Sequence, residues 1–345
     1  MIIFKDTKSI ITKSQIMNIK NILENRFIYP FPDKISPFGK ALQEIANTQW
    51  IDGELKDLLP LATREKYKHT NTGIMSARWW PTTPTLDRMI PLSRFMLWAM
   101  YNDDMYEVAT PNEIHFAQER SIAVLKGKIS PEQAQIPLAY QLAAIREDFL
   151  KFIPSESINR FADSLNEYFD GLEMEVLYQQ NGTFPSVGNL ISIRVRSLMV
   201  CAFVDTIEIQ TGITLPDRIY KHPVIKRLYH LSSSIIIYFN DVQSLHKDEV
   251  SGRLYFNLLG VLQHHYQLSK EEALEETIRM HNEDLEEFLL LKSTLPDFGE
   301  WQEAVIEIIE CMGMFIKGWQ TTSLLETKRY NNNGFPQIEE LPKIE

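Results

Sequence analysis

Three oxygen-bearing side chains recur along one stretch of the chain, at Asn240, Ser244 and Asp248. Their spacing places them within roughly 80° of one another on one face of a helix, because a helix completes a turn in about 3.6 residues. Oxygen donors of this kind suit a hard divalent cation, Mg²⁺ before Zn²⁺. Mg²⁺ bound by a few side chains usually completes its octahedron with water and phosphate. The spacing therefore predicts a magnesium site that faces a phosphorylated ligand.

A second acidic group consists of Asp103, Asp104 and Glu107. Asp103 and Glu107 are one helical turn apart, so their carboxylates can converge, whereas Asp104 lies about 100° round the helix. Two like charges at this spacing destabilise a bare helix, and a bound cation would turn that repulsion into binding. Taken alone, these acids could equally be a solvated helix end. The presence of the first group favours the metal interpretation. Both groups follow strongly apolar helical runs, as expected if two facing helices each present oxygen donors at one end of the bundle.

Helices are the elements that must position these groups. Apolar residues recur at helical spacing, in segments separated by prolines, while clean period-two alternation and hairpin signals are scarce. The sequence predicts an all-α, single-domain helical bundle. Four segments are apolar on more than one side and are expected inside that bundle, at residues 91–102, 190–209, 231–239 and 301–319.

The overall composition narrows the classes of partner. The chain has 345 residues, of which 44 % are hydrophobic, enough to build a core. A net charge of −11 without a Lys/Arg-rich block argues against nucleic acid as a partner. Two distant cysteines, Cys201 and Cys311, favour a reducing cytoplasm over a disulfide framework. The N-terminus is apolar for only a few residues, so neither a signal peptide nor membrane insertion is expected.

With the two groups in this order along an all-α chain, the sequence resembles the class I terpene synthases (terpenoid cyclases), particularly the single-domain microbial type. Residues 103–107, Asp-Asp-Met-Tyr-Glu, resemble their aspartate-rich motif in its DDxxE form. Residues 240–248 resemble their second metal motif, Asn-Asp-x-x-Ser-x-x-Lys-Glu. One departure is that Asp248 stands where the family usually has Glu, with Glu249 next to it. Either acid could therefore be the metal ligand.

Further residues fall where the family would put them. Arg194 resembles the arginine that senses diphosphate, and Arg329-Tyr330 resembles the C-terminal pair that closes over it. The resemblance implies an active-site cavity inside a catalytic domain at residues 28–331. It leaves residues 1–27 as an N-terminal lead-in and residues 332–345 as a flexible C-terminal tail.

The resemblance also implies a mechanism. Three Mg²⁺ ions would promote release of diphosphate from a linear prenyl diphosphate, and the carbocation would cyclise to a di- or sesquiterpene hydrocarbon or alcohol. The implied metal ligands are Asp103, Asp104, Glu107, Asn240, Ser244 and Asp248. The implied catalytic residues, which also bind the diphosphate, are Arg194, Lys247, Arg329 and Tyr330. An anionic substrate needs such local positive charge in a protein of net charge −11.

Contacts with the prenyl chain are expected from Met100, Ala99 and Trp319. Family members often place aromatic residues three and four positions before the first Asp of the acidic motif, where this chain has Met100 and Ala99. Smaller or softer side chains there would leave a longer cavity, which favours geranylgeranyl over farnesyl diphosphate. Other candidate aromatic wall residues are Trp79, Phe95, Trp98, Tyr238 and Phe239.

Two other interpretations of the sequence are retained. A chain-elongating prenyl diphosphate synthase shares fold and metals, but it should carry a second Asp-Asp motif late in the chain, and Asp103-Asp104 is the only such pair. In a non-catalytic helical scaffold the acids would be solvated and Arg194 would be an ion-pair partner. A homodimer is compatible with each interpretation.

Overall fold

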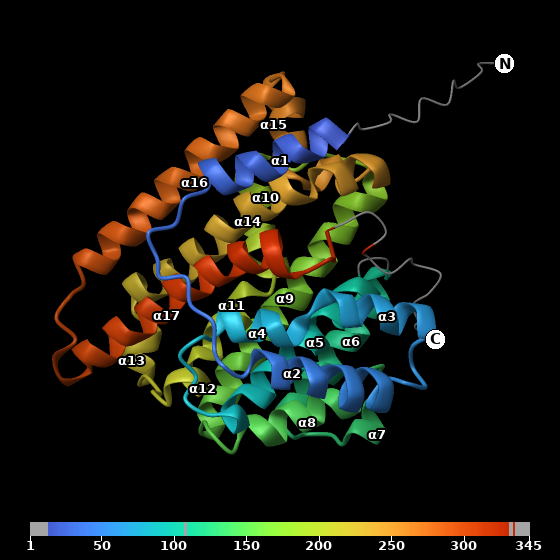
Figure 1. Ribbon diagram of the computed structural model, residues 1–345, viewed down its shortest axis with the longest axis vertical. Helices are drawn as coiled ribbons and strands as arrows, with labels where there is room; N and C mark the ends of the chain where they lie inside the picture. The colour runs from blue at the N-terminus through green and yellow to red at the C-terminus, as the bar shows by residue number, and fades with distance from the viewer. Residues whose placement is uncertain (1–12, 107–108, 331–333, 335–345) are drawn as a thin grey trace.

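The computed structural model describes residues 13–106, 109–330 and 334, with side chains described from residue 19 onward. These residues form helices and no strand, which confirms the predicted all-α class. The longest of the helices are α5 (Leu86–Tyr106), α9 (Ser155–Asn181), α14 (Pro223–Ser251), α16 (Lys270–Ser293) and α17 (Gln302–Thr321) (Figure 1).

The shorter helices complete the chain order. They are α1 (Lys13–Arg26), α2 (Gly39–Ile45), η1 (Ala46–Glu54), α3 (Leu61–Thr70), α4 (Thr72–Trp79), α6 (Pro111–Leu125), α7 (Pro131–Ala134), α8 (Ala139–Phe149), α10 (Val187–Ser197), α11 (Val200–Asp205), α12 (Ile207–Thr211), α13 (Asp217–Tyr220), η2 (Leu254–Phe256), α15 (Leu258–Tyr266), η3 (Gly299–Trp301) and η4 (Thr322–Glu326).

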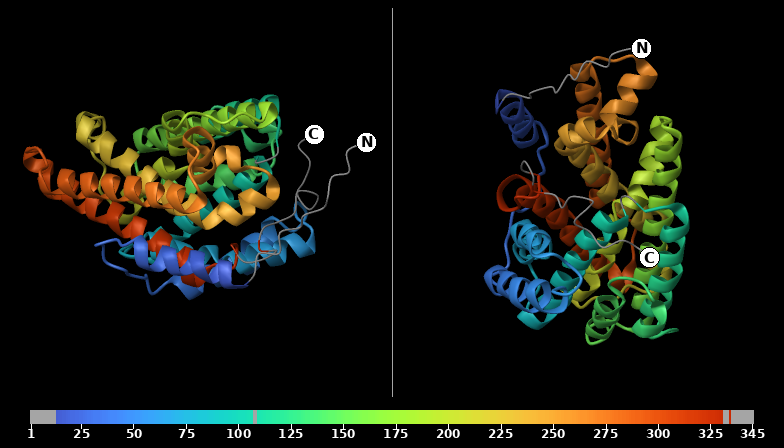
Figure 2. Two further views of the ribbon diagram at one scale, coloured as in Figure 1. Left: turned by 90° about the horizontal axis from the view of Figure 1, so that it is seen from above. Right: turned by 90° about the vertical axis from the view of Figure 1, so that its right-hand side faces the viewer.

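Helix α14 lies within the bundle, where it packs against α1, α10, α11, α16 and α17. The N-terminal helices, coloured blue, and α9, coloured green, lie on opposite sides of the molecule (Figure 2). Helix α17 joins the two parts of the core, because it packs against α14 on one face and against α4 and α12 elsewhere. The two helices with polar motifs, α5 and α14, are therefore held from several sides.

Helix α14 has well-defined ends. It begins with Pro223, whose fixed φ suits the first helical position, where no N–H is needed for the ladder. It ends at Gly252, whose φ of 73° is a left-handed conformation that glycine adopts without strain. The N–H of the next residue, Arg253, donates to the carbonyl of Asp248 at 2.8 Å. This closing hydrogen bond fixes the backbone directly after the metal motif.

The predicted apolar helix over residues 190–209 is wrong in one respect, because the chain breaks there. Helix α10 ends at Ser197, α11 starts at Val200, and Met199 between them has a left-handed φ of 60°. Neither glycine nor proline marks the break, so the sequence pattern did not reveal it. Gly171 of α9 allows the close approach, since a Cβ there would lie 2.6 Å from the Ser197 nitrogen.

No single described helix is long and apolar enough to cross a membrane. Helix α10 and the segment formed by α11 and α12 are together long and apolar enough for a membrane span, by length and composition only, and the two parts are bent by 43° relative to each other. In the bundle, α10 packs against α9 and α14.

The segment expected as a lead-in contains α1, which packs on α14. Leu23 and Phe27 are buried, and the Phe27 ring meets the ring of Phe239 edge-on at 5.6 Å. The side chain of Gln320 donates hydrogen bonds to the backbone carbonyls of both residues, at 3.3 Å and 2.6 Å. Leu23 and Phe27 thus belong to the packed core, while the domain limits at 27/28 and 331/332 stay predictions. The tail, Gly334 apart, lies outside the described residues.

Candidate active site

A cavity opens between α5, α9, α10, α14, α17 and the segment that follows η4. It is lined by most of the residues that the sequence predicted for the site, namely Ala99, Met100, Asp103, Arg194, Asn240, Ser244, Lys247, Asp248, Trp319, Arg329 and Tyr330. Asp104 does not line it, and Glu107 lies outside the described residues. Residues more than 200 positions apart in the chain therefore face one space.

The three oxygen-bearing side chains of the donor row of α14, Asn240, Ser244 and Asp248, all line the cavity, and the last two are linked by a hydrogen bond. The hydroxyl of Ser244 donates to Asp248 Oδ2 at 2.7 Å, and the side-chain amide of Asn257 donates to the same oxygen at 2.9 Å. Burial raises the pKa of Asp248, and these two hydrogen bonds oppose that rise. Glu249 instead pairs with Lys270 of α16 at 2.6 Å and does not line the cavity. The geometry thus favours Asp248 over Glu249 as the cavity carboxylate.

The two adjacent aspartates of α5 have different surroundings. The side chain of Asp103 is accessible from the cavity, and the protein around it raises its pKa, mainly through burial and then through the charge of Asp104. Asp104 is 4 % exposed and forms a two-pronged ion pair with Arg329, with Nη1 at 2.9 Å from Oδ2. The hydroxyl of Tyr67 donates to the same oxygen at 2.8 Å. Asp104 is engaged behind the cavity and would have to leave Arg329 to reach a metal.

Arg194 lies among three polar partners on α9 and α14. Its Nη2 donates to Asn240 Oδ1 at 3.0 Å and to Asp241 Oδ1 at 2.7 Å, while Nη1 lies 3.7 Å from Glu175 Oε1. Burial alone would lower the pKa of Arg194, but Asp241 and Glu175 raise it. The carboxylate of Asp241 also accepts from the backbone N–H of Leu258 at 2.8 Å. Arg194 is thus held against the metal motif.

Glu175 is a cavity residue that the sequence did not predict. Burial raises its pKa to about 7, against the opposing effects of Arg194 and of a hydrogen bond from Ser197. It belongs to the acidic and apolar alternation of α9, where nothing distinguishes it from the neighbouring glutamates. Arg253 is a second unpredicted residue that lines the cavity. No spacing signal could have identified either one, because each reaches the cavity only through the packing of its helix or turn.

The apolar wall differs from the predicted set. Trp319, Phe203 and Phe256 line the cavity, and Leu172 and Leu198 add aliphatic surface. The other predicted aromatics, Trp79, Phe95, Trp98, Tyr238 and Phe239, are buried but do not line it. Two of them support the wall from behind: the Trp79 ring stacks on Trp319 with centroids 4.6 Å apart, and the Phe95 ring centroid lies 4.8 Å from that of Phe203.

The donor set fits a hard divalent cation. Asp103, Asn240, Ser244 and Asp248 present only oxygen atoms to the same cavity. Across residues 13–106, 109–330 and 334, no three His, Cys, Asp or Glu side chains gather into a group that could hold a metal by themselves. A metal at this cavity would therefore need the amide of Asn240 and the hydroxyl of Ser244 as ligands. The described part of the chain does not contain the closed Cys/His set that binds a structural zinc.

A protein-family comparison decides the assignment. The model of terpene synthase family 2, C-terminal metal binding, matches residues 94–287, which is more than half of the chain. The chain belongs to the terpene synthase family. The match spans both groups that the sequence predicts as metal ligands, from the acidic group of α5 to the donor row of α14, so a metal-dependent synthase is favoured over a non-catalytic scaffold.

Individual relatives agree with this family. The terpene synthase is 28 % identical to (+)-T-muurolol synthase ((2E,6E)-farnesyl diphosphate cyclizing) of Roseiflexus castenholzii, over 82 % of this chain and 86 % of the relative. It is 25 % identical to germacrene A synthase of Nostoc punctiforme, over 88 % and 94 % of the two chains. The crystal structure of linalool/nerolidol synthase from Streptomyces clavuligerus superposes with a TM-score of 0.71 at 19 % identity, over 86 % of this chain and 99 % of the other. That structural likeness shows the shared all-α fold.

Proposed function

We propose that this terpene synthase is a class I cyclase that ionises farnesyl diphosphate with the help of Mg²⁺ and cyclises the resulting cation to a sesquiterpene. The observation that carries the proposal is the single cavity onto which oxygen donors from α5 and α14 and the basic residues Arg194, Lys247 and Arg329 converge. Acids and bases facing one space suit metal ions and an anionic ligand bound together.

The metal ions would be held by Asp103 on one side and by Asn240, Ser244 and Asp248 on the other. When bound, Mg²⁺ supplies positive charge that stabilises the departing diphosphate. Asp104 is assigned a different task, because its carboxylate already holds Arg329. Through that ion pair it would keep the segment after η4 close to the cavity. Magnesium as the ion, the number of three ions, a homodimer and a cytoplasmic location remain predictions.

The diphosphate would be bound by Arg194, Lys247, Arg329 and Tyr330. Arginine suits the task because its planar group donates to two phosphate oxygens at once. Arg194 and Arg329 are both paired with carboxylates in the structure. Binding of diphosphate would therefore exchange one anionic partner for another, which keeps the desolvation cost of the arginines small.

The cation would form beside the break between α10 and α11. Ser197 and Leu198, at the C-terminal end of α10, line the cavity. The last carbonyl groups of a helix lack intrahelical partners and carry partial negative charge, which stabilises a positive charge nearby. The ring faces of Trp319 and Phe203 would add about 0.5 to 2 kcal/mol each to such a cation and exclude water from it.

The proposed substrate replaces the sequence-based preference for geranylgeranyl diphosphate. That preference depended on Met100 and Ala99, which do line the cavity. Phe203 and Trp319 line it too, so large rings limit the space that the two smaller side chains leave. The relatives from Roseiflexus castenholzii and Streptosporangium roseum are both named as cyclising (2E,6E)-farnesyl diphosphate. Together these observations favour the shorter chain.

The test is an incubation of the purified protein and Mg²⁺ with geranyl, farnesyl or geranylgeranyl diphosphate in turn, followed by gas chromatography of the extract and an assay of released diphosphate. A cyclic sesquiterpene from farnesyl diphosphate is expected. Cyclic product from geranylgeranyl diphosphate alone would overturn the substrate, and absence of product and of diphosphate release with all three would overturn the activity. An Asp103→Asn variant serves as the inactive control.

A further inference from the structure

Arg253 is a basic residue of the cavity to which neither metal motif assigns a task. It lines the same space as Asp103, together with Arg194, Lys247 and Arg329. It differs from them in origin, because it comes from the turn that ends α14. Its side chain is partly buried.

The backbone of Arg253 is tied to the donor row of α14. Its N–H donates to the carbonyl of Asp248 at 2.8 Å, and the left-handed Gly252 makes the turn that allows this bond. Four residues later Asn257 donates to the side chain of Asp248 at 2.9 Å and to the carbonyl of Asp241 at 2.8 Å. These hydrogen bonds tie the turn to the helix at both ends, so the backbone of Arg253 is held beside Asp248, a proposed metal ligand.

Arg253 and Asp103 line the same cavity and carry opposite charges, so their side chains attract each other. Burial lowers the pKa of Arg253, and the charges of Tyr255 and Asp103 oppose that shift. The converse holds for Asp103, whose pKa is raised by burial and lowered by Arg329, Lys247 and Arg253. Arg253 therefore helps to balance the charge of the carboxylate that is proposed as a metal ligand on α5.

We propose that Arg253 acts twice in the same site, first as a counter-ion of Asp103 and then as a diphosphate ligand. This inference rests on the proposed function. A divalent cation bound to Asp103 would offset the attraction that the carboxylate exerts and would repel the guanidinium. Arg253 then turns to the phosphate oxygens that enter with the substrate, where it can donate two hydrogen bonds. The diphosphate site thus gains a further arginine from the end of α14.

The two roles predict opposite effects of one substitution. Arg253→Gln removes a cation that competes with metal for Asp103, so Mg²⁺ alone should bind about three-fold more tightly. The same change removes a charge-assisted hydrogen bond to phosphate, so inorganic diphosphate in the presence of saturating Mg²⁺ should bind about ten-fold more weakly. A residue that only shaped the turn after α14 would weaken both affinities or neither.

The measurement is isothermal titration calorimetry of the full chain, first with Mg²⁺ alone and then with inorganic diphosphate in Mg²⁺. Arg253→Lys keeps the charge, so its affinities for Mg²⁺ and for diphosphate should both be close to those of the wild type. Arg196→Gln is the matched control, because Arg196 is exposed on α10 and does not line the cavity. It should leave both affinities unchanged. Circular dichroism melting identifies any variant that does not fold, and if Arg253→Gln does not fold, Arg253→Met, which also removes the charge, takes its place.

Opposite changes in the two affinities of Arg253→Gln would support the inference. Unchanged or jointly weakened affinities in a folded variant would overturn it while leaving the proposed function in place. A wild-type protein that binds no diphosphate in Mg²⁺ would instead overturn the proposed function itself.

Discussion

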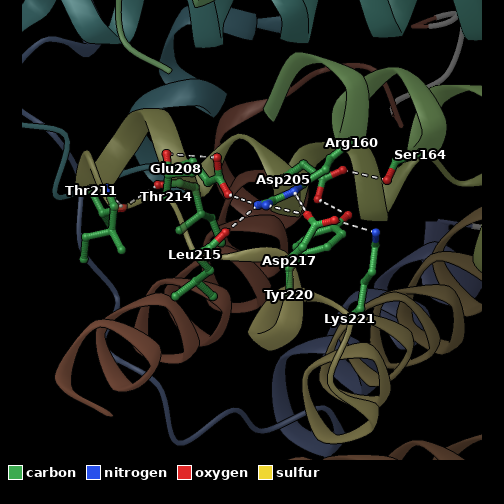
Figure 3. Close-up of polar contacts among 12 residues, drawn as sticks. Arg160, Ser164, Asp205, Glu208, Thr211, Thr214, Leu215, Asp217, Tyr220 and Lys221 are labelled. Carbon is green, nitrogen blue, oxygen red and sulfur yellow. Dashed lines mark hydrogen bonds and ion pairs between the residues drawn. The ribbon is translucent and has the colours of Figure 1, made fainter. Parts of the chain in front are cut away.

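Two arginine clusters at the two ends of α9 look alike in composition and differ in use. The cavity cluster consists of Arg194, Glu175 and Asp241, and the outer cluster of Arg160, Glu208 and Asp217, with Asp205 and Tyr220 beside them (Figure 3). Each has a largely buried arginine between two carboxylates, and each has a glutamate whose pKa burial raises to about 7. Charge and burial alone therefore do not distinguish the proposed active site.

The outer cluster uses its arginine in full. Arg160 donates through Nε and Nη2 to Asp217, at 3.1 and 2.7 Å, and through Nη1 to Glu208 at 3.1 Å and to the carbonyl of Leu215 at 2.7 Å. Its guanidinium also lies over the Tyr220 ring, 4.6 Å from the centroid. The hydroxyl of Tyr220 in turn donates to Asp205 at 3.0 Å. Figure 3 shows these contacts joining α9, α12 and α13.

The cavity cluster leaves hydrogen-bonding capacity unused. Among the described residues, Nε of Arg194 is buried and has no hydrogen-bond partner, and Nη1 is 3.7 Å from Glu175. Arg194 lines the candidate active-site cavity, whereas Arg160 lines a separate hollow together with Asp217 and Tyr220. Spare donors beside the cavity, and not charge by itself, are therefore what make Arg194 a candidate binding residue. The predictions below test that distinction, from the largest expected effect to the smallest.

The largest difference in kcat is expected between substitutions of Asn240, next to Arg194, and of Asp217, next to Arg160. Asn240→Ala removes a proposed metal ligand and should lower kcat by about 1,000-fold or more. Asp217→Asn changes an outer partner and should leave kcat within about two-fold. Steady-state release of inorganic diphosphate from farnesyl diphosphate measures both. Near-normal turnover by Asn240→Ala would remove the basis for treating the two regions differently.

The arginines themselves should separate activity from stability. Arg194→Gln should lower kcat/KM by about 100-fold, because a donor to phosphate is lost. Arg160→Gln should leave kcat/KM of the folded enzyme nearly unchanged and lower the free energy of unfolding by about 2 kcal/mol, since Glu208 loses its partner. Urea unfolding and kinetics on the same preparations make the comparison. A larger loss of activity in Arg160→Gln than in Arg194→Gln would reverse the assignment of the two clusters.

Glu175 and Glu208 should contribute alike to the pH dependence of stability. Both have a folded-state pKa of about 7, above the model-compound value of 4.5, so the folded protein holds their protons longer than the unfolded chain does. Stability should therefore fall as the pH rises from about 4.5 to about 7. Glu175→Gln and Glu208→Gln should each flatten this part of the curve.

Activity again should distinguish the two glutamates. Glu175 lies next to Arg194, so Glu175→Gln should also lower kcat/KM by about ten-fold, whereas Glu208→Gln should not. Unfolding in urea across the pH range, with kinetics at one pH, supplies both readouts. A pH–stability curve that neither substitution changes would contradict the burial argument for both clusters.

The smallest effect is expected from Glu249. Its carboxylate pairs with Lys270 outside the cavity, so Glu249→Gln should leave kcat within about two-fold. Asp248→Asn removes a charged cavity ligand and should lower kcat by about 100-fold or more. If activity depended strongly on Glu249, that residue would be assigned as the metal ligand in place of Asp248.

Local spacing explains why much of the site could be predicted from sequence. Asn240, Ser244 and Asp248 share a helix face because four-residue intervals do so in any helix. The sequence interval between Asp103 and Glu107 is also one helical turn, which is why the acidic group could be recognised. The all-α class follows from apolar periodicity, which is also a local property. The family resemblance then supplied Arg194 and Arg329, whose distance from the metal motifs along the chain carries no geometric signal of its own.

Long-range packing explains what sequence could not supply. The pairing of Asp104 with Arg329 joins residues 225 positions apart, and it gives adjacent aspartates opposite surroundings. Glu175 reaches Arg194 only because Gly171 lets α9 approach the break after Ser197. The break itself arises at Met199, in a segment whose composition favours an uninterrupted helix.

The sequence by itself determined the all-α class, the donor row of α14 and the family resemblance, because these depend on residue type and on intervals within one or two turns. Only the tertiary structure decided that Asp103 faces the cavity while Asp104 holds Arg329, that Asp248 and not Glu249 lines the cavity, and that Arg253 joins it. Each of these outcomes depends on which neighbour a side chain meets across the bundle. That neighbour is set by the packing of whole helices.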